Sequence, residues 1–220
     1  MEPSTVQDVI ARMSAIDGEL DPSDGAAVFN AIYLRVTRGV GDLLAAGGTF
    51  ADPAFMEQLD VTFARYWFDA YDDTGRSRAW APLFECRHEP LLPIQFALAG
   101  MNAHIEHDLP LAVVASCAAH GREPSSIRAD YERVNDLLAS IEAEIRRSFL
   151  DQLGRAVDDR VGRVAHLVSA WDIEKARDAA WATVCLLWEI RGSAFLTGLQ
   201  HDVLERAVGM GSRLLLTPVD

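Results

Sequence analysis

Apolar residues recur at helical spacing along almost the whole chain, and no segment shows the alternation typical of a β-strand. This pattern predicts an all-α protein. Residues 26–45 give the clearest example, because their apolar side chains form one stripe along a helix: Phe29, Ile32, Tyr33, Val36, Val40 and Leu43. The predicted helices cover about residues 5–16, 26–45, 53–71, 93–108, 109–120, 125–153, 158–170, 173–191 and 194–215, with a further helical turn near 80–85.

Turn-forming residues separate the predicted helices. The run DGELDPSDG follows the first helix and GGTFADP follows the second, where Asp52 and Pro53 have the types preferred at the N-cap and at the first position of a helix. Residues 72–92 are mostly predicted loop. Since no repeat or long linker divides the chain, residues 1–220 are predicted to form a single helical-bundle domain of about eight or nine helices.

One apolar run carries polar residues that a plain core helix would not need. In ALAGMNAHIEHDLPLAVV, residues 97–114, His104 and Asp108 are i, i+4 neighbours, so their side chains can meet on one helix face. The small residue Gly100 precedes His104 on that face and is expected to leave room above the imidazole. At about 100° per residue, six residues share roughly a third of the helix circumference: Ala97, Gly100, His104, His107, Asp108 and Leu111.

Two kinds of chemistry fit an imidazole paired with a carboxylate in apolar surroundings. The carboxylate of Asp108 can fix the tautomer of His104 and make it a general base near neutral pH. Alternatively, both side chains can bind a divalent metal together with carboxylates from facing helices. Asp60 is the best candidate for such a partner, since it lies in the aromatic helix 53–71. Tyr131 is a further candidate for a polar group in the pocket.

A purely structural interpretation of the same segment is equally consistent with the sequence. Pro110 disfavours a helical conformation at the preceding residue and removes a backbone donor. Asp108 would then be the N-cap of a new helix and His107 a surface residue. His104 would be a core histidine bonded to a backbone carbonyl.

Composition narrows the classes of partner and compartment. The 220 residues carry a net charge of −13, which argues against binding to nucleic acid or to an anionic membrane. No run reaches the roughly 18 apolar residues of a membrane span, and the first residues, MEPSTVQDVI, lack the pattern of a signal peptide. The three cysteines show no CxxC spacing. We therefore expect a cytoplasmic protein.

Other familiar reaction classes lack support in the sequence. The chain has no phosphate-binding glycine loop and no G-x-S-x-G nucleophile motif. Its only lysine, Lys175, lies in a polar segment, and the charged residues around 174–178 are expected to form solvated helix surface. The cofactor therefore stays unknown, and the candidates are a divalent metal or a haem with His104 as ligand.

Several blocks of the sequence resemble a known family. These are LDVTFARYWFDAY (59–71), PIQFALAGMNAHIEHDLPLAVV (93–114), DYERVNDLLASIE (130–142) and ARDAAWATVCLLWEIR (176–191). Together they resemble an uncharacterised bacterial family classified only as a domain of unknown function and marked by an ALAGMNAHI-x-x-DLPLA block. Family members carry Asn where this chain has Glu106. The resemblance covers nearly the whole chain and implies a single helical domain, but it implies no activity and no catalytic residue.

Three functions follow as hypotheses. The first is an enzyme of specialised metabolism that performs proton-transfer chemistry on a small apolar molecule, such as a cyclisation, an isomerisation, a lyase reaction or a hydrolysis. In it His104 and Asp108 are catalytic, and Gly100, His107, Asp60 and Tyr131 bind the substrate. The second is a non-catalytic helical module that binds a small molecule or a protein. The third is a metalloenzyme with His104 as ligand, joined by Asp108 and Asp60. The aromatic helix 53–71 leaves open whether the chain forms a homodimer.

Overall fold

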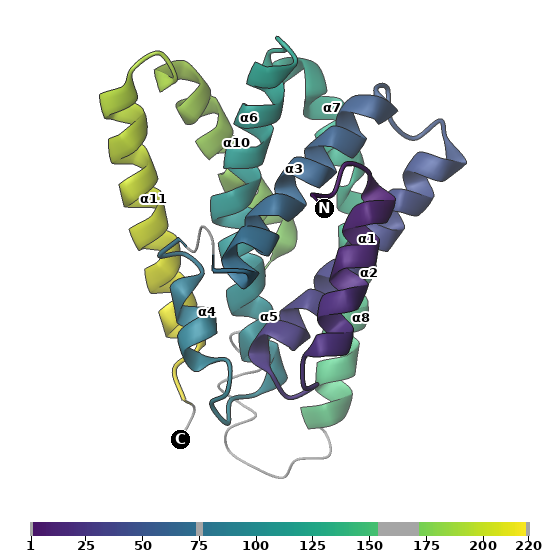
Figure 1. Cartoon of the computed structure of the whole chain (residues 1–220), viewed down its shortest axis with the longest axis vertical. Helices are drawn as coiled ribbons and strands as arrows, with labels where there is room; N and C mark the ends of the chain where they lie inside the picture. Colours follow the sequence, from purple (N-terminus) through teal and green to yellow (C-terminus); the bar gives the residue numbers. More distant parts are fainter. Residues whose placement is uncertain (1, 74–76, 154–171, 219–220) are drawn as a thin grey trace.

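The structure, a computed structural model, describes residues 2–73, 77–153 and 172–218, and every regular element in these ranges is a helix (Figure 1). The all-α prediction is confirmed. The elements are α1 (Val6–Glu19), α2 (Gly25–Ala46), α3 (Pro53–Tyr71), α4 (Ala81–Cys86), α5 (Pro93–Asn102), the π-helix η1 (Ala103–Asp108), α6 (Leu109–Ala119), the 3₁₀ turn η2 (Pro124–Ile127), α7 (Arg128–Arg133), α8 (Asn135–Leu153), α10 (Ile173–Ile190) and α11 (Ala194–Leu215).

The predicted helix over 125–153 is interrupted in the structure. It consists of the 3₁₀ turn, α7 and α8, because tertiary hydrogen bonds hold α7 in place. The carboxylate of Asp130 accepts from the backbone N–H groups of Ala51 and Asp52, at 2.8 and 2.9 Å. The hydroxyl of Tyr131 donates to the carbonyl of Arg177, at 2.8 Å. The helix predicted over 158–170 lies outside the described residues.

Side-chain caps begin several helices where the sequence predicts them. Asp52 accepts a hydrogen bond from the N–H of Phe55, at 3.0 Å, and Pro53 is the first residue of α3. Both residues therefore have their predicted roles. At the start of α1, Thr5 and Asp8 form a reciprocal capping box. These caps satisfy backbone donors that have no partner inside the helix.

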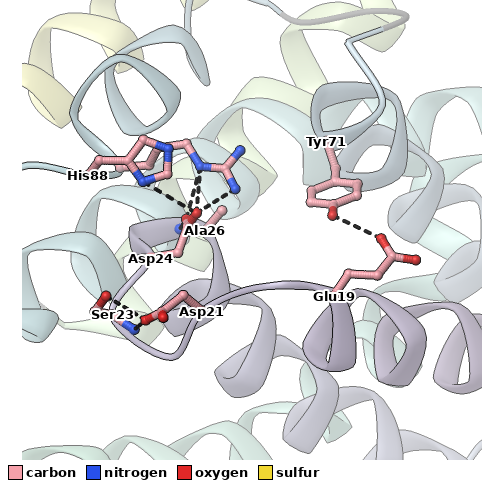
Figure 2. A network of polar contacts seen from close by, with 8 residues as sticks. Glu19, Asp21, Ser23, Asp24, Ala26, Tyr71 and His88 are labelled. Atoms are coloured by element: carbon pink, nitrogen blue, oxygen red, sulfur yellow. Dashed lines mark hydrogen bonds and ion pairs between the residues drawn. The ribbon is translucent and has the colours of Figure 1, made fainter.

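Ionic and polar contacts tie the start of α2 to its neighbours (Figure 2). The carboxylate of Asp24 caps α2 by accepting from the N–H of Ala26, at 2.8 Å. It also accepts from the guanidinium of Arg87, at 2.6 and 2.8 Å, just after α4. In the same view, the hydroxyl of Tyr71 donates to Glu19, at 3.2 Å. These contacts join α1, α2, α3 and the end of α4 around one edge of the core.

A buried polar relay links the first three helices. The amide of Asn30 in α2 donates to the carbonyl of Met13 in α1, at 2.9 Å, and accepts from the indole of Trp67 in α3, at 3.1 Å. Each of these buried groups has its partner, which avoids the cost of an unpaired polar atom. Phe55 and Phe68 are buried like Trp67, so these large aromatic residues of α3 belong to the core.

The segment formed by α5, η1 and α6 runs through the centre of the molecule, and residues 94–105 are all buried. It contacts α2 and α11 through α5, and α3 and α10 through α6. Polar side chains in this segment must therefore find protein partners. Gln95 donates to the carbonyls of Leu215 and Thr217, each at 2.8 Å. Asn102 donates to the carbonyl of Val208, at 3.0 Å, so both residues hold the C-terminal part of the chain.

A π-turn carries this central segment past Pro110 without a break. Pro110 cannot donate to the carbonyl of Glu106. Instead, the N–H of Leu109 bonds to the carbonyl of His104, five residues earlier. Asp108 has helical backbone angles, φ −75° and ψ −38°, and its side chain caps no helix. The N-cap interpretation of Asp108 is therefore wrong, because the helix continues where a new one was expected.

The outer face of α11 is apolar and exposed. This helix lies along one edge of the molecule (Figure 1), and Phe195 is 78% exposed. Five further large apolar residues of the same helix are exposed as well: Leu196, Leu199, Val203, Met210 and Leu214. Neither α11 nor any other helix in the described ranges combines the length and the apolar character needed to cross a membrane.

Exchanging Gly100 for Ala tests the packing around the central segment. A Cβ atom at Gly100 would lie 2.4 Å from the Cδ2 atom of Phe29, whose ring is enclosed by Trp67 and Trp80. We expect Gly100→Ala to lower the free energy of unfolding by about 1–3 kcal/mol. Gly198→Ala is the control, because a Cβ there meets nothing within 4 Å. It should raise the same quantity by about 0.5–1 kcal/mol. Equal effects in urea unfolding would contradict the packing described.

Candidate functional site

The carboxylate of Asp108 lies at the centre of the candidate site. Its Oδ2 atom is 2.9 Å from Nδ1 of His104 and also accepts from the indole N–H of Trp80, at 2.9 Å. Its Oδ1 atom is 2.7 Å from Nδ1 of His107. The side chains of Asp108 and His104 are 1% and 4% exposed. The structure thus brings His104 and Asp108 together, as their spacing predicts, and adds two further donors.

These contacts fix the protonation of the pair. Burial raises the pKa of Asp108, but the hydrogen bonds from His104 and His107 outweigh burial, so the net pKa is lowered. An ionised carboxylate can only accept hydrogen bonds, so both Nδ1 atoms donate. Burial lowers the pKa of His104, although Asp108 partly opposes this effect. His104 is therefore neutral near pH 7, with its proton on Nδ1 and a lone pair on Nε2.

Aromatic rings hold the imidazole of His104 in one orientation. The ring of Phe63 stacks on it, with centroids 3.6 Å apart and planes 8° from parallel. The rings of Tyr33 and Phe29 approach it edge-on, at 4.2 and 5.7 Å. Because α2 supplies two of these rings and α3 the third, three elements of the fold position one side chain.

His104 lines a largely apolar cavity of about 100 Å³. The cavity lies between α2, α3, the central segment α5–η1–α6 and the helices α7, α8 and α10. Its polar or ionisable lining residues are Tyr33, Asp60, His104, Tyr131 and Arg177. The apolar lining residues are Phe29, Ile32, Val36, Val40, Met56, Leu59, Phe63, Met101, Ile105, Leu109, Val134, Leu138 and Ile173.

Three residues that line the cavity carry buried polar atoms without a hydrogen-bond partner among the described residues. These atoms are Nε2 of His104, the hydroxyl oxygen of Tyr33 and Oδ2 of Asp60. Buried polar atoms are nearly always paired in folded proteins, so unpaired ones call for an explanation such as a ligand. Three such atoms, on residues that line one cavity, therefore point to a ligand that can form hydrogen bonds.

Asp60 has an unusual carboxyl group. The residue is partly exposed, but its unpaired Oδ2 atom is covered. Burial, together with the nearby charge of Glu57, raises the pKa of Asp60 to about 7. The group therefore exists as both acid and carboxylate near neutral pH, which is the range suited to proton transfer. Asp60 was predicted from the sequence to face this site, and it lines the same cavity as His104.

The other predicted site residues divide into two groups. Tyr131 lines the cavity, as expected. Gly100 does not line it, because the ring of Phe29 occupies the space that its missing side chain leaves. His107 does not line it either. It is 4% exposed, so it is not a surface residue, and its Nε2 atom lies 3.9 Å from Glu205 on α11. His107 therefore contacts Asp108 from outside the cavity lining.

Two residues of the site, Trp80 and Arg177, were not predicted from the sequence, and nothing in the sequence directed Tyr33 toward the site. Trp80 lies in a segment predicted as loop with one helical turn, and no periodicity in the sequence points its indole toward Asp108. Arg177 belongs to the polar segment expected to be solvated, yet it is only 5% exposed and lines the cavity. The apolar neighbours Ile173, Ala176 and Ala180 on α10 were the available signal, because Arg177 shares their buried face.

The predicted metal ligands do not form a cluster. Among the described residues, no group of three or more His, Cys, Asp and Glu side chains is arranged to hold a metal ion. His104, Asp108 and Asp60 therefore do not make up such a group. Both oxygens of Asp108 already accept hydrogen bonds from ring nitrogens.

Comparison with known proteins gives one match. The model of a family described as "Family of unknown function (DUF5995)" matches residues 6–218. No curated protein and no solved structure matches the chain. The family match covers all the helices described above and agrees with the resemblance seen in the sequence blocks.

Replacing Asp60 by Asn tests the burial of its carboxyl group. The pKa of Asp60 is raised from 3.8 to about 7 in the folded protein. As the pH rises through this interval, the unfolded chain releases the proton that the folded protein retains, so the wild type loses stability. Asp60→Asn removes this loss. Its stability relative to wild type should therefore grow by on the order of 3 kcal/mol between about pH 4 and pH 8, as measured by urea unfolding.

The control for this experiment is Asp42→Asn, which changes an exposed carboxylate on α2. Because its side chain is exposed, this variant supplies the reference for the general effect of losing one carboxylate, against which the change in Asp60→Asn is compared. A flat difference for Asp60→Asn would show that this carboxyl group titrates normally and is not buried as described.

Proposed function

The chain belongs to this family of unknown function (DUF5995), and we propose that it is an enzyme that transfers protons on a small, largely apolar molecule. His104 is the general base and acid, and Asp108 is the carboxylate that orients it. The reaction belongs to the class of cyclisations, isomerisations, eliminations or hydrolyses, and specialised metabolism is its expected setting. The observation that carries this proposal is that His104, a neutral residue of the cavity lining, has a buried Nε2 atom without a hydrogen-bond partner among the described residues.

The energetics of the pair favour a catalytic role over simple packing. A buried polar atom without a partner costs about 1–3 kcal/mol, and this cavity has three. A histidine of this tautomer that served only as core would have Nε2 paired with a donor of the protein. Here the neighbouring groups instead fix the tautomer and leave the basic nitrogen unpaired. A ligand that supplies a donor to Nε2 would offset part of the cost.

The proposed proton transfer follows from these contacts. Nε2 of His104 takes a proton from the substrate, and the imidazolium that forms is stabilised by the ionised Asp108. The N–H groups of Trp80 and His107 stabilise the negative charge of Asp108, so the proton stays on the imidazole. His104 then returns the proton to another atom of the substrate or to a leaving group.

Two further groups complement the base. Asp60, with a pKa of about 7, can donate or accept a second proton within the same cavity. Burial raises the pKa of Tyr33 well above its usual value, so its hydroxyl stays protonated and can donate a hydrogen bond to developing negative charge. A base and two hydrogen-bond donors beside an apolar lining suit the enolisation of a carbonyl compound.

A small-molecule partner and a cytoplasmic location belong to the same proposal. The net charge of −13 argues against polyanionic partners. Cys86, Cys117 and Cys185 are free thiols, which are typical of a reducing compartment. A non-catalytic protein that binds a small molecule is the second candidate, favoured by the predominance of apolar side chains around the cavity.

Hydrogen–deuterium exchange at the α-carbon of cyclohexanone tests the proposed base. Exchange requires removal of a C–H proton and its replacement by a deuteron, and it can be followed by proton NMR in D₂O. We expect the wild type to exceed an equal concentration of free imidazole. His104→Gln and Asp108→Asn should each lower the protein-catalysed rate by about 10²-fold or more, because one removes the base and the other its orientation.

The matched control is His120→Gln. His120 is an exposed histidine whose Nδ1 atom lies 2.9 Å from the carbonyl oxygen of Ser116, and it lies outside the cavity lining. It should exchange at the wild-type rate. If His104→Gln also retains the wild-type rate, His104 is not the base. If cyclohexanone shifts the NMR signals of cavity residues and no exchange occurs, the result favours the second candidate function, a protein that binds a small molecule without catalysis.

A further inference from the structure

A buried arginine lines the cavity as well. Arg177, in α10, is 5% exposed and belongs to the cavity lining. No ion pair links it to Asp60, the carboxyl group of the same cavity, nor to any other carboxylate among the described residues. A buried cation without a counter-ion is costly, so its surroundings need explanation.

The protein holds Arg177 with neutral groups only. Its Nε donates to the side-chain oxygen of Asn135, at 2.6 Å, and its Nη2 donates to the carbonyl of Tyr131, at 2.5 Å. The ring of Tyr131 lies 4.0 Å from Cζ. The nearby carboxylate of Asp178 lies 3.3 Å from Arg128 instead. These contacts fix the position of the guanidinium, and the carboxylates of Glu132 and Asp178 act on its charge only from a distance, because both form their ion pairs with Arg128.

One edge of the guanidinium remains available. Within the described chain, Nη1 of Arg177 makes no hydrogen bond, although Nε and Nη2 do. A guanidinium can offer parallel N–H donors to a carboxylate, and such charge-assisted pairs are among the strongest hydrogen bonds in proteins. A structural arginine that merely joins α10 to Tyr131 and Asn135 would not need to line a cavity.

We infer that the ligand of this cavity is a small apolar carboxylic acid, whose carboxylate pairs with Arg177 while its hydrocarbon part lies along the apolar lining toward His104. This inference rests on the proposed function and names the substrate class for it. The arrangement also orients the ligand, because a carboxylate beside Asp60 would face another acidic group rather than a cation. The atom that reacts at His104 is then on the part of the molecule remote from the carboxylate.

The size of the cavity limits the ligand. It measures about 100 Å³, which is less than the roughly 150 Å³ of an apolar cavity that holds benzene in another protein, so the ligand must be slender or compact. Hexanoate is the probe because its unbranched chain is slender and flexible. Its uncharged counterpart, 1-hexanol, has the same chain length and isolates the contribution of the carboxylate.

Calorimetric titration with hexanoate and 1-hexanol tests the inference. At neutral pH we expect the wild type to bind hexanoate at least tenfold more tightly than 1-hexanol. Arg177→Met keeps an unbranched apolar side chain but removes the charge, so it should abolish this preference with little effect on 1-hexanol. Arg206→Met is the control: Arg206 is an exposed residue of α11 that pairs with Asp202 and lies outside the cavity lining, so its removal should leave the preference intact.

A second variant covers the case in which Arg177→Met does not fold, as judged by circular dichroism. Arg177→Lys keeps the positive charge and should bind hexanoate more tightly than 1-hexanol, but with a smaller ratio than wild type. The inference is overturned if the wild type binds the two probes equally, or if folded Arg177→Met retains the preference.

These outcomes are distinct from failure of the proposed function. Cyclohexanone exchange that depends on His104, combined with equal binding of hexanoate and 1-hexanol, would support His104 as the base and contradict a carboxylic acid as the ligand. Selective binding of hexanoate without any exchange would support a carboxylic acid as the ligand and contradict the proposed proton-transfer reaction.

Discussion

The buried carboxylate of Asp108 is the interaction on which the rest of the site depends. An ionised group in the core is stable only when donors satisfy its oxygens, and here His104, His107 and Trp80 do so. This requirement joins the segment before α4 to the central helix. It also determines which nitrogen of His104 carries the proton. The carboxylate of Asp108 therefore determines both the packing of the core and the chemistry of the site, because it holds the proton of His104 on Nδ1 and leaves Nε2 unpaired.

The sequence predicts much of the fold because its information is local. Helical periodicity and the capping pair Asp52–Pro53 depend on neighbours a few residues apart, and both agree with the structure. The pairing of His104 with Asp108 is local too, since the two residues lie one turn apart. The effect of Pro110 was misjudged because a proline can end a helix or widen one turn, and burial on all sides favoured the second outcome here.

The remainder of the site depends on contacts distant in sequence, which periodicity does not encode. Trp80 reaches Asp108 across 28 positions. Gly100 was expected to leave room above the imidazole, but Phe29 from another helix fills that space. Arg177 was assigned to the surface from its charged neighbours, whereas its helix face is buried. In each case the residue type indicated a special environment, and only tertiary packing determined which one.

The cavity combines an apolar lining with a neutral base, an acid of raised pKa and an unpaired cation, which is an arrangement for orienting a small amphipathic molecule. Nitrogen-15 NMR of the histidine rings near pH 7, with His104→Gln to assign the signal, tests its basis most directly. We predict that His104 is neutral, with Nδ1 protonated and Nε2 unprotonated. A proton on Nε2 of the neutral ring, or a charged imidazolium, would contradict the role given to Asp108.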